Sequence, residues 1–193
     1  MRKYVALLAV VLCTLWYATP AAADGQVVTN GGFETGDFTG WSVSGQTFFA
    51  GVDNFDAYSG AYGAYLGGTG GTVTLSQTLS ADYAGDSLVV SFALGENIDG
   101  IPTSGSNDTM VVTLGGTTLL NLNNPTVDAG QYLVYTFDLV APSTSFVLSF
   151  TAENDDDYWS LDNASVIAPE PQTLLLLGPA LAGLAFLRRR VSA

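Results

Sequence analysis

The side chains that could do chemistry in residues 24–168 are almost all carboxylates. Of the chain's 18 Asp and Glu residues, all but Glu170 lie in this segment, which contains no His, Cys, Lys or Arg. Nucleophile pairs of the Ser–His or Cys–His type, Schiff-base lysines, histidine metal sites and arginine clamps are therefore excluded. Only a carboxylate pair of the glycoside hydrolase type remains, and nothing in the sequence singles out two of these acids. We expect no catalytic residues and no enzyme, with a glycoside hydrolase as the remote alternative.

The same composition gives residues 24–168 a formal charge of −17, because all five Lys and Arg residues of the chain lie outside the segment. Such a chain repels phosphate backbones, so we expect no nucleic-acid partner. It attracts divalent cations. The densest acidic run, residues 153–157, is either a calcium-binding loop or a solvated turn before the last strand. We expect the turn, because the run lacks the glycine and the ordered ligand spacing of calcium loops.

Aromatic side chains are the other candidates for a binding role. Protein surfaces that bind sugars stack pyranose rings on exposed aromatic rings flanked by Asp, Asn or Gln. The pairs Phe55/Tyr58 and Tyr158/Trp159 lie in predicted loops beside acidic residues, and we expect these four to contact sugar. We expect most of the other aromatic residues to pack in a core: Phe48, Phe49, Tyr62, Tyr65, Tyr132 and Tyr135.

These side chains must be positioned by strands. Residues 24–168 are rich in Val, Leu, Thr and aromatic residues between Gly, Asn and Asp turns, which predicts one all-β domain over residues 24–167. Expected strands are 41–44, 47–49, 61–66, 73–79, 87–94, 110–114, 117–122, 131–139, 144–151 and 158–167. Gly115-Gly116 predicts a two-residue hairpin turn, and residues 67–71 a flexible turn. About eight to ten antiparallel strands with this spacing predict a two-sheet jelly-roll sandwich.

Three short motifs in this domain resemble those of galactose-binding-like jelly rolls, which include several carbohydrate-binding modules. They are Asn30-Gly-Gly-Phe-Glu34 with Trp41, Ser59-Gly-Ala-Tyr62, and Leu161-Asp-Asn163. The resemblance covers most of residues 27–167. It implies one structural calcium ion held by the Gly32 carbonyl, the Glu34 carboxylate, a backbone oxygen near Ser59 and the Asp162 carboxylate. The alternative is that Glu34 caps a turn and Asp162 accepts hydrogen bonds from nearby backbone amides.

The start of the chain is typical of a secretory signal peptide. Arg2 and Lys3 precede an apolar run over residues 4–17, and Ala21-Ala22-Ala23 forms a small-residue cleavage site. We expect a signal peptide over residues 1–23 that is cut after Ala23, with an uncleaved anchor as the alternative. Cys13, the only cysteine, lies inside it, so we expect no disulfide in the mature protein.

Residues 168–193 carry a second signal. Pro169-Glu170-Pro171 is followed by an uncharged run, from which we expect a short transmembrane helix over residues 173–187, and then by Arg188, Arg189 and Arg190. The run is shorter than the roughly 17–25 residues of a stable span, and the arginines mark a cytoplasmic side. This order resembles the PEP-CTERM sorting signal of Gram-negative bacteria. The resemblance implies cleavage near Pro169-Glu170-Pro171 by an exosortase, and an ordinary tail anchor is the alternative.

The two terminal signals and the domain between them lead to one functional expectation. The protein is exported through the Sec translocon, anchored transiently in the inner membrane as a precursor, and then sorted by an exosortase to the cell surface or extracellular matrix. There we expect a non-enzymatic, structural or adhesive role in exopolysaccharide. The alternative is a carbohydrate-binding module with a defined polysaccharide ligand.

Overall fold

Every regular element that the structure describes, apart from one short 3-10 turn, is a β-strand. The computed structural model describes residues 25–80, 85, 87–97, 107–124 and 131–168, and Gln26–Ala168 form one compact unit. The elements in chain order are β1 (Ser42–Gly45), the 3-10 turn η1 (Thr47–Phe49), β2 (Ala50–Asp53), β3 (Gly63–Ser80), β4 (Ser87–Asn97), β5 (Asp108–Leu114), β6 (Thr117–Asn123), β7 (Tyr132–Val140) and β8 (Ser145–Ile167).

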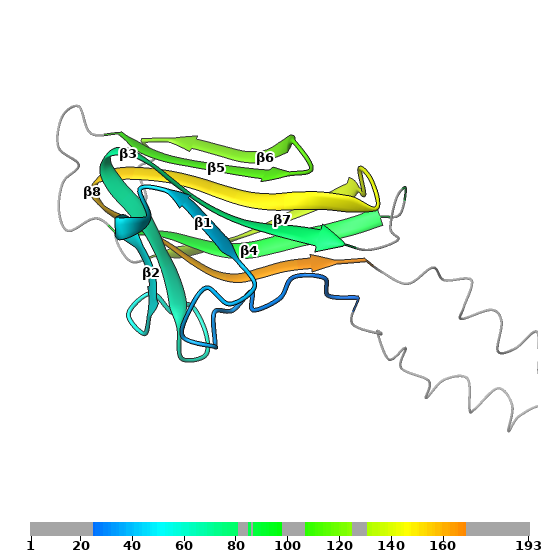
Figure 1. Cartoon of the computed structure of the whole chain (residues 1–193), viewed down its shortest axis with the longest axis horizontal. Coiled ribbons are helices and arrows are strands. Elements are labelled where there is room, and N and C mark those ends of the chain that lie inside the picture. Colours follow the sequence, from blue (N-terminus) through cyan, green and yellow to red (C-terminus); the bar gives the residue numbers. More distant parts are fainter. Residues whose placement is uncertain (1–24, 81–84, 86, 98–106, 125–130, 169–193) are drawn as a thin grey trace, which may run out of the picture. The chain divides into compact units, whose positions relative to one another are not determined.

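The two longest strands, β3 and β8, each belong to both layers of the sandwich (Figure 1). In one layer the order is β1, the second half of β3, the first half of β8, β5 and β6. In the other layer it is β2, the first half of β3, the second half of β8, β4 and β7. All of these pairings are antiparallel. The predicted all-β sandwich is therefore confirmed, with the two layers joined through two shared strands.

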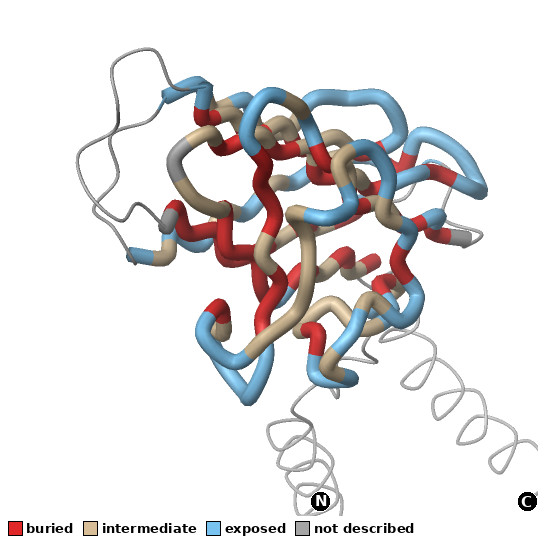
Figure 2. Tube along the Cα trace, turned by 60° about the vertical axis from the view of Figure 1, so that its left-hand side comes forward, coloured by how far each residue is buried: buried red, intermediate tan, exposed pale blue. Residues whose placement is uncertain are grey.

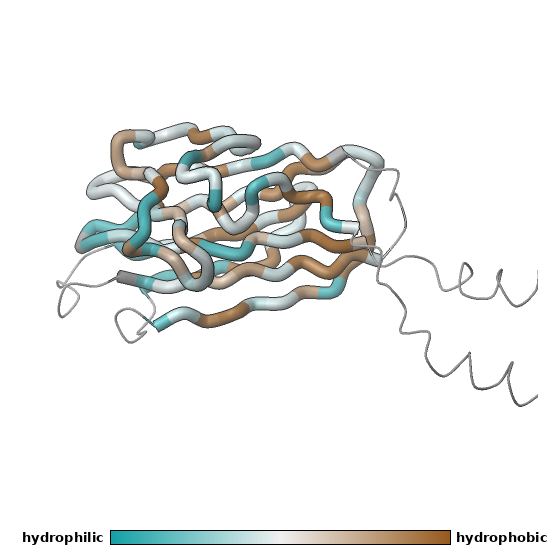
Figure 3. Tube along the Cα trace, turned by 90° about the horizontal axis from the view of Figure 1, so that it is seen from below, coloured by the Kyte–Doolittle hydropathy of each residue, from teal (hydrophilic) through white to brown (hydrophobic). Residues whose placement is uncertain are grey.

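The core lies between the layers, and buried residues alternate with more exposed ones along much of β3, β4, β5 and β8 (Figure 2). Leu88, Val90, Phe92 and Leu94 of β4 are all buried, as the alternation of the sequence predicts. Phe146, Leu148 and Phe150 of β8 face them from the other layer, with Phe92 and Phe150 edge to face at 5.2 Å between ring centroids. Polar residues separate the apolar ones along the strands in Figure 3.

The hairpin between β5 and β6 is also confirmed. Gly115 and Gly116 have φ values of +55° and +84°, the left-handed values that a two-residue turn of this type needs and that glycine adopts most readily.

The strand predictions were wrong where β3 and β8 cross between the layers. Residues 63–66 and 73–79 are not two strands joined by a glycine turn but parts of β3, which begins at Gly63 and not at Ala61. Residues 145–151 and 158–167 are likewise parts of β8, so the acidic run 153–157 is not a solvated turn but lies within a strand. Gly67 permits a close approach of the two strands, since a Cβ there would stand 2.8 Å from the Asp157 carbonyl oxygen. Residues 47–49 form η1 and not a strand.

The segment before β1 lies along the sandwich without forming a long strand. The N–H of Val27 donates to the Val166 carbonyl of β8 at 3.0 Å. The buried Gln77 side chain of β3 bonds both backbone groups of Thr29, at 2.7 Å to its N–H and 2.9 Å to its carbonyl. The Gln77 side chain, on the core face of β3, thus makes to this segment the two backbone hydrogen bonds that a neighbouring strand would otherwise make.

Candidate functional site

The three motifs of the sequence resemblance meet on the outside of β8. The buried Asp162 carboxylate accepts the backbone N–H groups of Tyr58 and Ser59, both at 2.9 Å, through one oxygen. Its other oxygen accepts the N–H of Asn163 at 2.6 Å. Asn163 in turn donates to the Ser59 hydroxyl at 2.9 Å. The loop between β2 and β3 is therefore fastened to β8 through one buried carboxylate.

Glu34 binds the same loop one turn further on. Its carboxylate accepts the N–H of Ala61 at 3.0 and 3.1 Å and the N–H of Tyr62 at 3.3 Å. Burial raises the pKa of Asp162, its backbone hydrogen bonds oppose that rise, and the negative charge of Glu34 adds to it. The two acids are therefore close enough to repel each other, and both make the amide contacts of the alternative interpretation.

The donor set suits calcium in kind but is small. Two carboxylates, those of Glu34 and Asp162, converge beside Gly32, where a Cβ would lie 3.7 Å from an Asp162 carboxylate oxygen. Within the described part of the chain, no group of three or more acidic residues is arranged to hold a metal. A calcium ion here would need backbone oxygens for most of its six to eight ligands.

A second buried acid, Asp56, fastens the middle of the same loop. Asp56 is 6 % exposed, and its carboxylate accepts the Ser160 hydroxyl of β8. Its backbone carbonyl accepts the Tyr132 hydroxyl of β7 at 2.6 Å. Burial raises the pKa of Asp56 to about 6, and the charges of Asp53 and Asp157 contribute to that rise. Asp56 thus fastens the loop over the second layer, although removing its carboxylate from water costs free energy.

The four predicted sugar-contact residues have different environments. Phe55 is 87 % exposed on this loop, and Tyr58 is 46 % exposed with its ring 5.3 Å from that of Tyr132. Trp159, by contrast, is 1 % exposed, and its indole N–H donates to the Glu153 carbonyl at 3.1 Å. The expectation that Trp159 stacks on sugar is therefore wrong, because β8 continues through this position and turns the side chain into the core.

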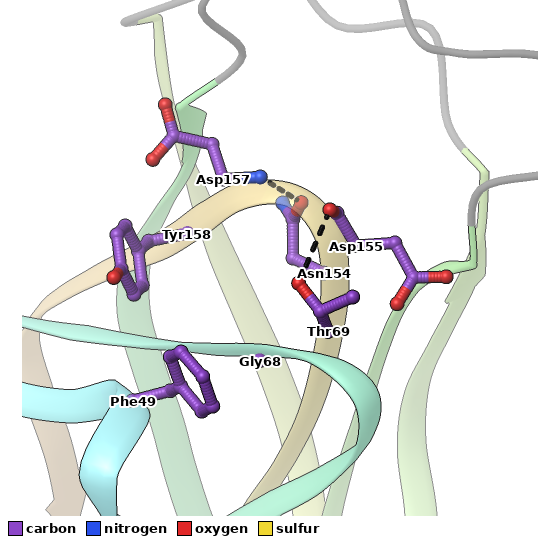
Figure 4. A pocket seen from close by; sticks show the side chains of 7 residues that line it. All are labelled: Phe49, Gly68, Thr69, Asn154, Asp155, Asp157 and Tyr158. Carbon is purple, nitrogen blue, oxygen red and sulfur yellow. Dashed lines mark hydrogen bonds between the residues drawn. The ribbon is translucent and has the colours of Figure 1, made fainter.

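Tyr158 points the other way and helps to line a surface hollow. The hollow has a volume of about 130 Å³ and is lined by Phe49, Gly68, Thr69, Asn154, Asp155, Asp157 and Tyr158. We call it the crossing hollow, because Gly68 of β3 pairs with Asn154 of β8 where both strands pass between the layers. Figure 4 shows the rings of Phe49 and Tyr158 on one side of it, with Thr69 and Asn154 on the other.

Backbone contacts fix the polar side of the crossing hollow. The Asp157 N–H donates to the Asn154 side-chain oxygen at 2.7 Å, and the Thr69 hydroxyl donates to the Asp155 carbonyl at 3.4 Å. The Asp155 carboxylate points away from the two rings (Figure 4), where it accepts the Gly70 N–H at 2.7 Å. The hollow therefore combines two aromatic rings with fixed polar groups, a composition suited to a small polar ligand with an apolar face.

Sequence reasoning missed Phe49, Thr69 and Asn154 as members of this site. Phe49 had been assigned to the core, and Thr69 and Asn154 to two separate turns. The only signal that could have joined them is that a glycine run and an acidic run each interrupt a predicted strand. Tyr65 lies beside them, with its ring centroid 5.1 Å from that of Tyr158, so it is a further aromatic neighbour of the crossing hollow.

The predicted processing and membrane residues lie outside the described residues. These are Ala23, Pro169, Glu170, Pro171, Arg188, Arg189 and Arg190, with the signal peptide 1–23 and the predicted transmembrane helix 173–187. In the part of the chain that is described, no helix is long and apolar enough to cross a membrane.

Comparison with models of known protein families gave no match, and comparison with curated proteins gave none. Solved structures do match. The module TmCBM61, determined in complex with β-1,4-galactotriose, has a TM-score of 0.55 and 21 % identity over 74 % of this chain and 98 % of its own. The CBM22-1–GH10 modules of Clostridium thermocellum xylanase 10B, complexed with xylohexaose, have a TM-score of 0.52 and 16 % identity, covering 76 % of this chain and 29 % of that one.

The enzymatically active domain of bacteriophage CBA120 tailspike protein 4 also matches, with a TM-score of 0.53 and 11 % identity over 75 % of this chain and 21 % of its own. At these identities the similarity shows a shared fold. This chain therefore has a β-sandwich like those of carbohydrate-binding modules.

The raised pKa of Asp56 predicts a pH-dependent stability. The Asp56 carboxyl has a pKa of about 6 in the folded protein, against the ordinary value of 3.8, so folding favours its protonated form. This contribution to the free energy of unfolding is complete below about pH 3.8 and is lost as the pH rises to about 6. Asp56→Asn keeps an acceptor for Ser160 and removes the charge. In urea denaturation followed by Trp fluorescence, the variant should gain stability relative to the parent protein from about pH 4 to about pH 6 and hold that gain above it.

Asp138→Asn, which neutralises an exposed acid on β7, controls for the change in net charge. An Asp56→Asn stability difference that stays constant between pH 4 and pH 7 would contradict the prediction.

Proposed function

We propose that the unit Gln26–Ala168 is a carbohydrate-binding module and that it holds a sugar in the crossing hollow. The observation that carries the proposal is the pairing of the Phe49 and Tyr158 rings with the polar groups of Thr69 and Asn154 in one surface hollow. A sugar presents an apolar C–H face to a ring and hydroxyl groups to hydrogen-bonding side chains, so it needs both surfaces at once.

The fold supports this proposal. Carbohydrate-binding modules are among the structures with the same sandwich, and one of them was determined with β-1,4-galactotriose. The composition argues against an enzyme, because residues 24–168 lack His, Cys, Lys and Arg. A non-enzymatic binding role in an exopolysaccharide therefore suits this chain better than a purely structural role, which would leave the crossing hollow unexplained.

Alanine variants can separate the two aromatic regions. We expect Tyr158→Ala and Phe49→Ala each to weaken glycan binding about tenfold, since losing a stacked ring at a binding centre removes on the order of 1–2 kcal/mol. Phe55→Ala and Tyr58→Ala should leave affinity within about twofold. The measurement is a glycan array of neutral, acidic and amino-sugar oligosaccharides, followed by calorimetry with the strongest binder.

The full chain, kept in solution by a detergent without a sugar head group, is used for all four variants, and circular dichroism checks their folding. Loss of binding in Phe55→Ala or Tyr58→Ala alone would place the sugar on the loop between β2 and β3. Failure of the parent protein to bind any glycan would remove the proposed function.

We also propose that one structural calcium ion lies between Glu34 and Asp162. Two neighbouring carboxylates, in a segment without a single basic side chain, are a favourable place for a divalent cation, since burial and the charge of Glu34 both make the ionised form of Asp162 more costly and raise its pKa. The ion would fasten the segment before β1 to β8 and to the loop near Ser59, adding to the amide hydrogen bonds already there.

Calcium should therefore raise the melting temperature. At about hundredfold excess over Kd, a ligand of the folded state adds on the order of 3 kcal/mol, or about 5–10 °C for a domain of this size. Melting is followed with excess calcium and with EGTA. Glu34→Gln should lose most of this calcium shift, while Glu153→Gln, a matched charge change elsewhere, should keep it. Equal melting temperatures in calcium and in EGTA would rule the ion out.

We further propose that the terminal segments direct this module to the surface of a Gram-negative cell. The support is the order of Pro169-Glu170-Pro171, the uncharged run over residues 173–187 and the arginines at 188–190. The precursor is held briefly in the inner membrane, cut by an exosortase near Glu170, and passed to the cell surface or the extracellular matrix.

Replacing Pro169-Glu170-Pro171 by three alanines should stop this processing. In a host that has an exosortase, immunoblots of membrane and extracellular fractions should then show the larger precursor in the membrane and little protein outside. Replacing Thr144 and Ser145, which lie in the folded unit, by alanine is the control. Unchanged release of the triple variant would show that an exosortase does not read this motif.

A further inference from the structure

Two carboxylates stand at the rim of the crossing hollow. Asp155 and Asp157 belong to its lining, and their carboxylates lie outside the space between the two rings and Thr69 (Figure 4). Ionised carboxylates only accept hydrogen bonds. A ligand that stacks on a ring and also reaches this rim must bring hydrogen-bond donors or positive charge.

Further negative charge surrounds the aromatic side of the hollow. Burial raises the pKa of Tyr65, whose ring contacts Tyr158, and the charges of Asp53 and Asp56 raise it further. Burial likewise raises the pKa of Asp56, and the charge of Asp157 adds to that rise. Three acids carried by β2, the following loop and β8 thus contribute negative potential beside this tyrosine pair.

Nothing in residues 24–168 could balance an acidic ligand. The segment has a formal charge of −17 and no Lys, Arg or His that could pair with a carboxylate, sulfate or phosphate group. A uronic acid or sulfated sugar would therefore be repelled on approach and would find no partner in the hollow.

We infer that the glycan held in the crossing hollow carries unsubstituted amino groups, as in a de-N-acetylated hexosamine oligosaccharide. The inference rests on the proposed function and names its ligand class. An ammonium group supplies three donors and a positive charge, and a carboxylate at the rim, such as that of Asp157, binds it by a charge-assisted hydrogen bond. The faces of Tyr158 and Phe49 attract the same cation while they stack on the sugar ring.

Four trimers of equal length test this inference by calorimetry on the full chain, at about pH 6, where amino groups are protonated. They are β-1,4-linked glucosamine trimer, its N-acetylated form, galacturonic acid trimer and trilysine. We expect the glucosamine trimer to bind at least about tenfold more tightly than its N-acetylated form, and the galacturonic acid trimer not to bind.

The variant Asp157→Asn should lower affinity for the glucosamine trimer about five- to tenfold and leave affinity for the N-acetylated form within about twofold. Asp138→Asn removes the same charge from β7 and should change neither. Tyr158→Phe keeps the ring and should retain the preference for the amine, which separates stacking from any role of the hydroxyl group.

The outcomes divide clearly. Equal affinity for the amino and N-acetylated trimers, or tighter binding of the galacturonic acid trimer, would overturn the inference and leave the proposed function standing. Trilysine binding as tightly as glucosamine trimer, or an equal loss in Asp138→Asn, would mean general charge attraction and would also overturn it. If no sugar binds at all, the proposed function fails together with the inference.

Discussion

The pairing of β3 with β8 is the constraint on which the rest of the structure depends. These strands pair antiparallel in both layers, with register shifts where they pass from the first layer to the second. Every other strand pairs directly with one of them or with a strand that does. Their outer surface carries the loop between β2 and β3, and their crossing point carries the hollow. A change that uncoupled them would separate the two layers and remove the proposed binding site at the same time.

The periodic parts of this fold could be predicted from sequence, and the crossing could not. Alternation along β4 and in the first part of β8 reflects one buried face, which is a local property of the chain. Residues 67–71 and 153–157 have the composition of turns, since glycine and acidic residues favour turns when considered alone. They meet at a single pair, Gly68 with Asn154, between two register shifts, and Glu153 and Asn154 also pair with β5. Contacts between residues so far apart in the sequence leave no local mark. The hollow was missed for the same reason, although its member Tyr158 was predicted.

The unbalanced charge of the folded unit explains how its acids are used. Since no basic side chain exists within residues 24–168, carboxylates obtain their stabilising contacts from backbone N–H groups: Asp162 from the loop near Ser59, Glu34 from Ala61, and Asp155 from Gly70. Motif resemblance correctly indicated that the first two of these acids meet. It could not indicate how far amide contacts already satisfy them, because that depends on the exact path of a loop.

The two ends of the folded unit leave it side by side. Gln26 and Ile167 are antiparallel neighbours, at one end of the second half of β8 (Figure 1). The residues of β8 that line the crossing hollow, which all fall within 154–158, lie at the other end of that same strand segment. Asp157 and Ile167 are ten residue steps apart along the strand, a span of roughly 33 Å. A pull between a bound polymer and an attachment beyond residue 168 would run lengthwise along β8. Its hydrogen bonds to β3 and β4 would then be loaded together in shear and not peeled apart one at a time, an arrangement that resists a pulling force.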